Sequence, residues 1–476
     1  MNRHILFTAC WLALFSVLLF SVGQSSSAQI PQISQGSQTF QSAVPEGQPL
    51  AVGIPLQRNL KGGEQHVYRL HIEKGQFVHL IVEQKEIVVG VTIFDPDGTP
   101  VYDIPRQLYG TEPILFLAER EGQYRVEIRS GEATVPPGSY EVTVKALRTQ
   151  TPQDRSLVQA HGNYKAGLQL SQMNTREALL KALEKYQAAS QYYKEAGDRN
   201  GEALAQNNLG QIQFAFGNLK PSLDAFHQAD LLIDPTDTRA KAGVLLNLGV
   251  VQEALHETET ARATYLRALE VLKGSTMPDI EGIVLNNLGM LYCHLSEYQE
   301  ALNCFQQALK LLQAEVGRRM QRQQPGQDVV YSVATTLNNL GLVFAELGNL
   351  EKSADYYQQA LSLYSFSTNP NAKAYPLINL GNLLVTTQTN KSENLKKALK
   401  HYDEALPLIH LMGERLKEAS LLNNQGTAYL RLGNWLKAEE QSVKSLTLAT
   451  QLGDRKLQGH ALINLGGIAF EQGDFP

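Results

Sequence analysis

Apolar and small residues recur at helical spacing along the stretch Ile283–Leu312. Leu288 and Tyr292 fall on one face of a first predicted helix, and Ala301 and Phe305 repeat that spacing on a second one after a short turn. The pattern therefore predicts a helical hairpin. A single hairpin cannot bury its apolar face alone, so we expect further copies to stack against it.

The copies are marked by glycines that recur 39, 40, 52, 40, 45 and 40 residues apart: Gly210, Gly249, Gly289, Gly341, Gly381, Gly426 and Gly466. Twelve residues later stands Ala or Ser in five of the six complete units. Four residues further on stands Phe or Tyr, except at Ser442, and five inserted residues displace these positions in the unit of Gly381. Small residues let two helices approach, while the aromatic ring fills the space beside them. The array is predicted to be an α-solenoid.

These motifs are similar to the tetratricopeptide repeat, in which Leu-Gly is followed by a large residue and then by Ala-x-x-x-Phe. The resemblance covers residues 153–476 and implies a mainly α fold of stacked hairpins. Ala182, Tyr186 and Ala189 indicate an earlier, degenerate unit with Leu170 at its glycine position, and the hairpin that begins around Gly466 is incomplete.

Residues 56–148 show short alternating runs separated by turn signals such as Asp-Pro-Asp-Gly, which predicts a small antiparallel β-sandwich before the solenoid. Residues 29–55 are rich in Gln, Ser, Gly and Pro, and we interpret them as a disordered linker. Residues 1–28 combine Arg3, an apolar run and Ser-Ser-Ala. They predict a signal peptide, with an uncleaved membrane anchor as the alternative, and hence export to the periplasm, cell envelope or medium.

The succession Gly-Gly-Glu-x-His-x-Tyr, Phe-Asp-Pro-Asp-Gly and Gly-Gln-Tyr-Arg-Val-Glu resembles the bacterial pre-peptidase C-terminal β-domain. Together with the long repeats, this order resembles the front part of bacterial proteins that carry a caspase-like CHAT peptidase domain behind the array. In the same stretch Asp95 and Asp97 could bind calcium, although Asp-Pro-Asp-Gly is first of all a turn sequence.

Composition and motifs narrow the class of function. The net charge of −5 comes without a basic block, so we expect no nucleic-acid partner. His256-Glu257 is followed by Thr260 instead of the second histidine of a zinc protease, and the sequence has no Gly-x-Ser-x-Gly and no phosphate-binding glycine loop. We therefore predict no enzyme activity, no cofactor and no metal. Arg318, Arg319 and Arg322, in the longest gap between the glycines, predict a solvated helix face.

One polar position never varies within the array. Asn stands two residues before every glycine: Asn208, Asn247, Asn287, Asn339, Asn379, Asn424 and Asn464. In tetratricopeptide arrays the matching position faces the concave groove, where an amide can bond the backbone of a bound segment. The alternative is that each asparagine bonds a neighbouring helix, and both can hold.

We accordingly expect a module that binds a protein or peptide segment in the groove, with the seven asparagines as the peptide-binding residues. Cations are scarce at the groove positions, so a clamp for a terminal carboxylate is not expected. Two alternatives stay open. The chain could be the regulatory portion of a truncated CHAT-type peptidase, or the β-sandwich could attach to a surface or carbohydrate. A membrane is a partner only if residues 1–28 stay uncleaved.

Overall fold

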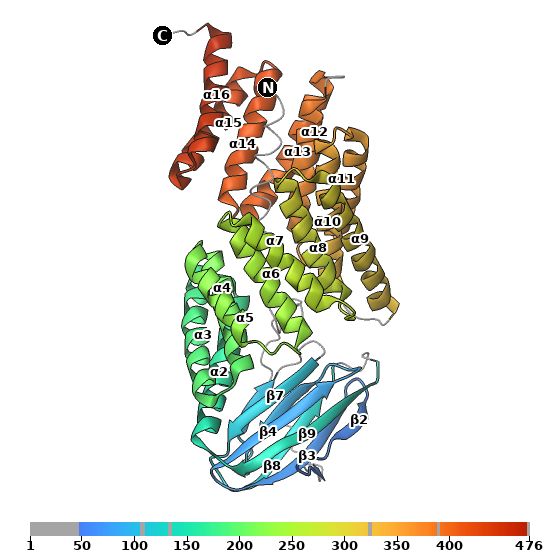
Figure 1. The fold of residues 1–476 in the computed structure, drawn as a ribbon, viewed down its shortest axis with the longest axis vertical. Helices are drawn as coiled ribbons and strands as arrows, with labels where there is room; N and C mark the ends of the chain where they lie inside the picture. Colours follow the sequence, from blue (N-terminus) through green and yellow to red (C-terminus); the bar gives the residue numbers. More distant parts are fainter. Residues whose placement is uncertain (1–46, 105–109, 132–135, 322–325, 388–390, 474–476) are drawn as a thin grey trace. The chain divides into compact units, whose positions relative to one another are not determined.

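The computed structural model describes residues 47–104, 110–131, 136–321, 326–387 and 391–473, and Figure 1 traces them. The chain forms two units that we describe separately, one ending at Val251 and the other beginning at Gln252. The predicted signal peptide or anchor, residues 1–28, lies outside the described residues. None of the described helices is long and apolar enough to cross a membrane.

The first unit opens with the predicted β-sandwich. Its five-stranded sheet has the order β1-β3-β8-β5-β6 and its four-stranded sheet the order β2-β9-β4-β7. The strands are β1 (Gln48–Pro49), β2 (Leu56–Leu60), β3 (Gln65–Ile72), β4 (Gln76–Gln84), β5 (Gly90–Phe94), β6 (Pro100–Ile104), β7 (Gly110–Leu117), β8 (Gly122–Arg129) and β9 (Gly138–Thr149). All pairs are antiparallel except β1 with β3.

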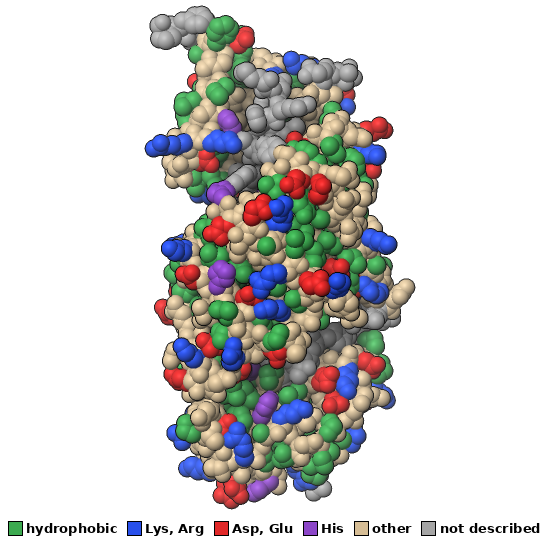
Figure 2. Space-filling view, viewed as in Figure 1, with side chains coloured by type: hydrophobic (Ala, Val, Ile, Leu, Met, Phe, Trp, Pro, Cys, Tyr) green, Lys and Arg blue, Asp and Glu red, His purple; other side chains and the backbone are tan. Residues whose placement is uncertain are grey.

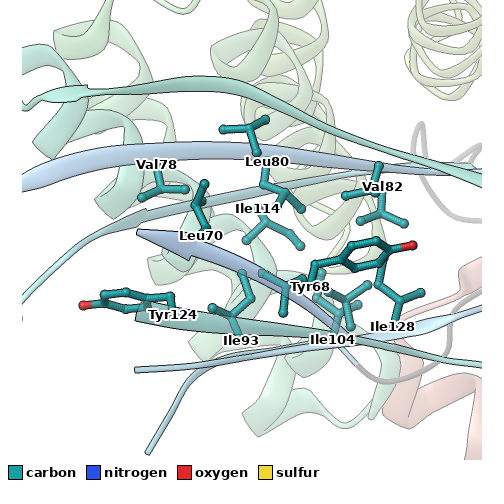
Figure 3. Packing of buried hydrophobic residues seen from close by; sticks show 14 of the residues in the cluster. Tyr68, Leu70, Val78, Leu80, Val82, Ile93, Ile104, Ile114, Tyr124 and Ile128 are labelled. Atoms are coloured by element: carbon teal, nitrogen blue, oxygen red, sulfur yellow. The ribbon is translucent and has the colours of Figure 1, made fainter. Parts of the chain in front are cut away.

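Alternation along the strands builds the core between the two sheets. Tyr68 and Leu70 of β3 are buried, as are Leu80 and Val82 of β4, and the alternate residues of β3 face outward. Figure 3 shows these side chains meeting Ile114 and their other neighbours in one apolar cluster. The two-residue period thus places one face of each strand against the opposite sheet.

The predicted linker 29–55 is wrong at its C-terminal end. Gln48 and Pro49 pair with Tyr68 and Arg69 of β3, and Val52 forms an isolated bridge with Val144. Leu50 of this stretch packs against the core of the sandwich. An existing sheet edge supplies the backbone partners that hold it, which composition could not reveal. The rest of this predicted linker, up to residue 46, lies outside the described residues.

Helices follow the sandwich: α2 (Pro152–Gln172), α3 (Arg176–Ala196), α4 (Arg199–Ala215), α5 (Leu219–Leu232) and α6 (Thr238–Ala254), whose last residues belong to the second unit. The helix α2 begins at a capping box in which Thr151 and Asp154 satisfy each other's backbone N–H groups. Two hydrogen bonds from Arg148 of β9 to Asp154, 2.5 and 2.8 Å long, fix this helix start to the sheet.

The second unit consists of helices: α7 (Thr258–Leu272), α8 (Pro278–His294), α9 (Tyr298–Gln321), α10 (Gln327–Glu346), α11 (Leu350–Tyr364), η2 (Pro370–Lys373), α12 (Ala374–Thr386), α13 (Lys391–Leu411), α14 (Arg415–Arg431), α15 (Trp435–Leu452) and α16 (Arg455–Gln472). From α8 to α15 successive helices pack as hairpins. The structure confirms the predicted fold class, a mainly helical solenoid preceded by a small β-sandwich.

The repeat glycines sit where an aromatic ring crosses the first helix of a hairpin. A Cβ on Gly289 would come within 2.7 Å of Phe305, and a Cβ on Gly381 within 2.3 Å of Tyr402. Where serine replaces alanine twelve residues after the glycine, its hydroxyl donates to the glycine carbonyl, as Ser353 does to Gly341 at 2.7 Å. Serine therefore fits this small-residue position without leaving an unpaired hydroxyl.

The glycine of the degenerate first hairpin was assigned to the wrong position. Tyr186 packs on Gly167, where a Cβ would lie within 2.8 Å of the ring, and Leu170 is one turn further along α2. Nineteen residues separate this glycine from its aromatic partner, against sixteen between Gly289 and Phe305. The connection from α2 to α3 has three residues, as the connection from α8 to α9 has, so the three extra residues lie in α3 before Tyr186. A fixed spacing could not detect this.

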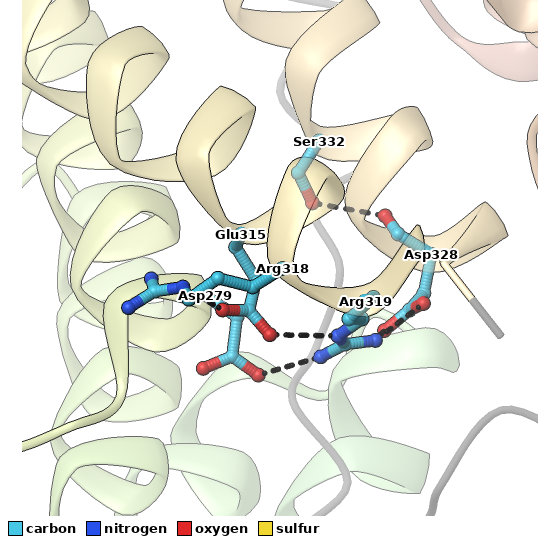
Figure 4. Close-up of polar contacts among 6 residues, drawn as sticks. All are labelled: Asp279, Glu315, Arg318, Arg319, Asp328 and Ser332. Carbon is cyan, nitrogen blue, oxygen red and sulfur yellow. Dashed lines mark hydrogen bonds and ion pairs between the residues drawn. The ribbon is translucent and has the colours of Figure 1, made fainter. Parts of the chain in front are cut away.

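The prediction of a solvated face at the end of α9 is also wrong for Arg319. Its side chain is 18% exposed and bonds Glu315, Asp328 and Asp279, at distances between 2.9 and 3.1 Å. Figure 4 shows the guanidinium between carboxylates from three helices, α8, α9 and α10. The long gap between the glycines therefore contains an ionic joint that ties these helices together.

Candidate functional site

The seven asparagines lie on successive first helices: α4, α6, α8, α10, α12, α14 and α16. Five of them are buried, with at most 7% of the side chain exposed: Asn208, Asn247, Asn287, Asn339 and Asn464. Asn379 and Asn424 are half-buried. Two residues span about 200° around a helix, so each asparagine lies nearly opposite the repeat glycine.

Most of these amides donate a hydrogen bond to an asparagine one repeat earlier. We call this series of hydrogen bonds the asparagine ladder. The Nδ2 atom of Asn247 lies 3.0 Å from Asn207 Oδ1, and that of Asn379 lies 3.0 Å from Asn338 Oδ1. The same bond joins Asn339 to Asn286 at 3.1 Å and Asn464 to Asn423 at 2.9 Å. Each accepting asparagine stands one residue before the invariant asparagine of its own repeat. Two adjacent sequence positions are therefore hydrogen-bonded from one repeat to the next.

Other acceptors are used where the position before the invariant asparagine holds a different residue. Asn424 donates to Asn382 at 3.0 Å, because the expected acceptor position holds Ile378, and Asn208 donates to the hydroxyl of Tyr164 at 3.0 Å. Asn287 is different, since its Nδ2 is buried and has no hydrogen-bond partner among the described residues. In the sequence the acceptor position of the preceding repeat is occupied by Leu246, which has no acceptor atom.

These contacts show the bonding to neighbouring helices that the sequence left as an alternative. They do not test peptide binding by the same residues. In Asn379 and Asn424, the Oδ1 atoms have no partner among the described residues, whereas each Nδ2 is engaged in the ladder. These two half-buried side chains therefore combine a fixed orientation with an acceptor that no described residue uses.

The acceptor column and Asn382 are the residues that sequence reasoning missed. Asn207, Asn286, Asn338 and Asn423 precede the invariant position, and their recurrence in four repeats was a visible signal. Asn382 gave no such signal, since it stands one residue after Gly381 and no other repeat has asparagine there. It accepts from Tyr402 at 2.7 Å as well as from Asn424, and thus links α12, α13 and α14.

Acidic side chains lie near the C-terminal ends of the first helices in the second unit. Glu253 pairs with His294 at 2.9 Å and accepts from the hydroxyl of Tyr265 at 3.2 Å, and burial raises the pKa of that hydroxyl well above its usual value. Glu346 is half-buried and has no hydrogen-bond or ion-pair partner among the described residues. Burial raises the pKa of its carboxyl group.

The possible calcium ligands in the sandwich are used differently. Asp95 Oδ1 accepts the backbone N–H groups of Asp97 and Thr99 at 3.0 and 2.8 Å, which closes the turn, and Arg120 pairs with both carboxylates. The two aspartates therefore fit a turn that is stabilised by ion pairs with an arginine. No cluster of potential metal ligands occurs in the ranges that the structure describes.

Charges of both signs are interspersed on the face drawn in Figure 2, and neither sign dominates a region of its coloured surface.

Comparison with known families concerns the helices. A family described as "Tetratricopeptide repeat" matches residues 241–314, 332–408 and 417–476, and a second family with that description matches residues 286–368. The helices from α6 onward therefore match the tetratricopeptide repeat.

Curated relatives match part of the array. The chain is 28% identical over 180 residues to the human "Cell division cycle protein 16 homolog", covering 37% of this chain and 25% of that protein. It is 25% identical over 166 residues to "Protein KINESIN LIGHT CHAIN-RELATED 3" of Arabidopsis thaliana, covering 34% of this chain and 23% of that protein. The chain thus spans about a quarter of the length of these relatives.

Solved structures align with part of this chain. The apo form of RapI aligns with a TM-score of 0.48 and 15% identity, covering 62% of this chain and 98% of that one. A tetratricopeptide repeat protein from Parabacteroides merdae aligns with a TM-score of 0.42 and 17% identity, covering 65% and 99%. The resemblances to the pre-peptidase β-domain and to CHAT proteins stay predictions.

Proposed function

We propose that this chain is a recognition module that binds a polypeptide segment along the first helices of its second unit. Tetratricopeptide repeats are generally non-catalytic scaffolds for protein–protein interaction, which supports recognition as the function. The particular partner is not identified by the fold. The chemistry of the exposed side chains beside the asparagine ladder indicates which chemical groups the bound segment should present.

The observation that supports this proposal most directly is the hydrogen bonding of Asn379 and Asn424. Each is half-buried and uses Nδ2 to hold its position in the ladder, and the Oδ1 atom of each has no partner among the described residues. A fixed acceptor next to a bonded donor suits the N–H groups of an extended backbone. The ladder therefore orients the amides in advance, which lowers the entropy lost on binding.

Glu346 adds a preference for charge. It lies seven residues after Asn339 on α10, about 10 Å along the helix at 1.5 Å per residue. Partial burial of its carboxylate has a desolvation cost, and no cation among the described residues offsets that cost. A segment with Lys or Arg at the matching position would supply that cation, whereas a terminal carboxylate would be repelled.

The test uses peptides selected on the wild-type chain from a displayed random library. We expect the selected peptides to be enriched in Lys and Arg, and the double variant N379A/N424A to bind them at least about tenfold more weakly, the equivalent of two lost hydrogen bonds. Asn303→Ala is the matched control, because Asn303 is exposed on α9 and outside the ladder. Circular dichroism checks that each variant folds.

Unchanged binding by the double variant, or equal losses in N379A/N424A and N303A, would remove the proposed site. Export of the module is a further part of the proposal, and it rests on the sequence of residues 1–28. Its measurement is the N-terminal residue of the protein recovered from outside the cytoplasm. Recovery of the intact N-terminus in the cytoplasm alone would contradict it.

A further inference from the structure

The first helices of the second unit carry a further position on the same face as the ladder asparagine. It lies seven residues later, which is about two turns and about 10 Å along the helix axis. On α8, α10, α12 and α14 this position holds His294, Glu346, Thr386 and Arg431. We call these four residues the rim row. Glu346 and Arg431 give the row two full charges of opposite sign.

Arg431 reaches back across one repeat. Its Nη1 atom donates to the carbonyl of Val385 over 3.0 Å, near the C-terminal end of α12. The side chain is exposed, and it makes no ion pair with a described carboxylate, including Glu471 at the equivalent position of α16. A guanidinium has five N–H donors. The contact with α12 therefore fixes the group and leaves donors for a further acceptor.

Helix α12 separates the two charges of the rim row. It packs on α10, which carries Glu346, and on α14, which carries Arg431. Neighbouring packed helices lie about 8–10 Å apart, and the bond to Val385 brings the guanidinium from α14 to α12. The carboxylate and the guanidinium are thus about one helix spacing apart. That is too far for them to pair with each other, and each stays available to a ligand.

We infer that the bound segment is ampholytic, with a basic side chain opposite Glu346 and an acidic side chain opposite Arg431. The inference rests on the proposed function, because both side chains belong to the segment held at Asn379 and Asn424. Residues of an extended chain advance about 3.3 Å each, and alternate residues share a face. A gap of about 10 Å therefore selects opposite charges two or four positions apart.

This pair of charges acts on specificity more than on affinity. A segment with an acidic residue opposite Glu346, or a basic residue opposite Arg431, meets a like charge. The structural alternative is that Arg431 serves only the C-terminal end of α12, where a cation stabilises the free carbonyl groups of a helix. In that case the charge of the peptide has no influence on the effect of an Arg431 substitution.

The test uses peptides selected on the wild-type chain from a displayed random library. Each peptide is synthesised in its selected form and with its acidic residue replaced by the corresponding neutral amide. Fluorescence anisotropy compares their binding to the wild type and to Arg431→Gln. The variant should bind the selected peptide about three- to fivefold more weakly, the size expected of an exposed ion pair. It should bind the neutral peptide as well as the wild type does.

Arg415→Gln is the matched control. Arg415 is exposed at the opposite end of α14, and it too donates a hydrogen bond to another helix, from Nη2 to Gln451 of α15 over 3.3 Å. Its substitution should leave the affinity for both peptides unchanged. Glu346→Gln should be coupled in the same way to the basic residue of the peptide, and not to the acidic one.

Charge reversal gives a readout that a damaged fold cannot imitate. Arg431→Glu should bind a peptide with Lys at the acidic position more tightly than it binds the selected peptide, whereas the wild type should show the opposite preference. Equal losses in R431Q and R415Q, or an R431Q effect that is the same for the selected and the neutral peptide, would overturn the inference.

The outcomes also separate this inference from the proposed function. Selected peptides that are weakened by N379A/N424A but lack an acidic residue two or four positions from the basic one overturn the inference alone. Peptides that bind N379A/N424A as tightly as the wild type remove the proposed site, and the inference fails with it.

Discussion

The Nδ2 atom of Asn339 donates to Oδ1 of Asn286 over 3.1 Å, although 53 residues separate the two in the sequence. Both side chains are buried, with 6% and 9% exposed. The bond joins the first helices of neighbouring repeats, so the asparagine ladder holds the stack together whatever else it binds. A buried amide that loses its partner retains the cost of desolvation.

We therefore expect Asn286→Ala and Asn339→Ala each to lower the free energy of unfolding by about 1–3 kcal/mol. The double variant should lose less than the sum of the single losses, because both partners of the bond are then absent. Urea unfolding followed by circular dichroism measures these values. Strictly additive losses would show that the two side chains do not interact in solution.

Gly289 and Gly459 separate crowding from helix propensity. A Cβ on Gly289 would lie 2.7 Å from the Phe305 ring, so Gly289→Ala should cost about 1–3 kcal/mol through overpacking. Gly459 has open space around it, and Gly459→Ala should stabilise the chain by about 0.5–1 kcal/mol through the backbone entropy of glycine. Thermal unfolding compares them, and shifts in the same direction would contradict the assigned contact.

The repeat periodicity made these glycine positions predictable, because the glycine, the small residue and the aromatic ring belong to one hairpin with a nearly fixed turn. Leu170 shows the limit of that reasoning. Helix α3 begins ten residues before Tyr186, whereas α9 begins seven residues before Phe305, and the ring of Tyr186 consequently lies on Gly167. A fixed spacing predicts the contact only while the aromatic residue keeps its distance from the start of the second helix.

The partners of the asparagines were less accessible to prediction. Each bond reaches across about one repeat, and it depends on how one hairpin stacks on the next. The invariance of the asparagines therefore indicated importance without indicating whether it was structural. Arg319 illustrates the same difficulty with charge. Its three carboxylate partners come from three helices, and the surrounding sequence looks like an ordinary solvated helix end.

Removing Arg319 should destabilise the second unit. Arg319→Ala leaves Asp279, Glu315 and Asp328 near one another without their shared cation, and we expect a loss of up to about 3 kcal/mol, the lower end for a broken buried ion pair. Arg318→Ala is the control, since its side chain is 46% exposed and pairs with Glu315 alone. Its loss should stay below about 1 kcal/mol. Urea unfolding distinguishes the two, and equal losses would exclude a special role of Arg319.

Glu346 predicts a pH dependence in the second unit. Burial raises the pKa of its carboxyl group, so the folded state holds this proton at a higher pH than the unfolded chain does. Stability should therefore fall as the pH rises from the unfolded pKa through the raised folded one. Relative to the wild type, Glu346→Gln should gain stability at neutral pH and lose that advantage in acid. An advantage that is independent of pH would contradict this assignment.

His161 predicts the opposite dependence in the first unit. Burial, with a smaller effect of Lys165, lowers the pKa of this imidazole to about 4, while the carbonyl of Pro113 accepts a hydrogen bond from it and His79 adds a further unfavourable charge. Its Nε2 atom is buried and has no hydrogen-bond partner in the part of the chain that the structure describes. Between pH 6.5 and about 4 the unfolded chain binds a proton that the folded chain does not.

Stability should accordingly fall across that window by on the order of 3 kcal/mol, since one pKa unit corresponds to about 1.4 kcal/mol. The loss should be largely absent in His161→Asn, whose amide nitrogen takes the place of Nδ1 as the donor for Pro113 but cannot titrate. Urea unfolding at a series of pH values, followed by the fluorescence of a reporter placed on β7, measures the joint between sandwich and α2. If the wild type and H161N lose stability in parallel, another group is responsible for the acid sensitivity.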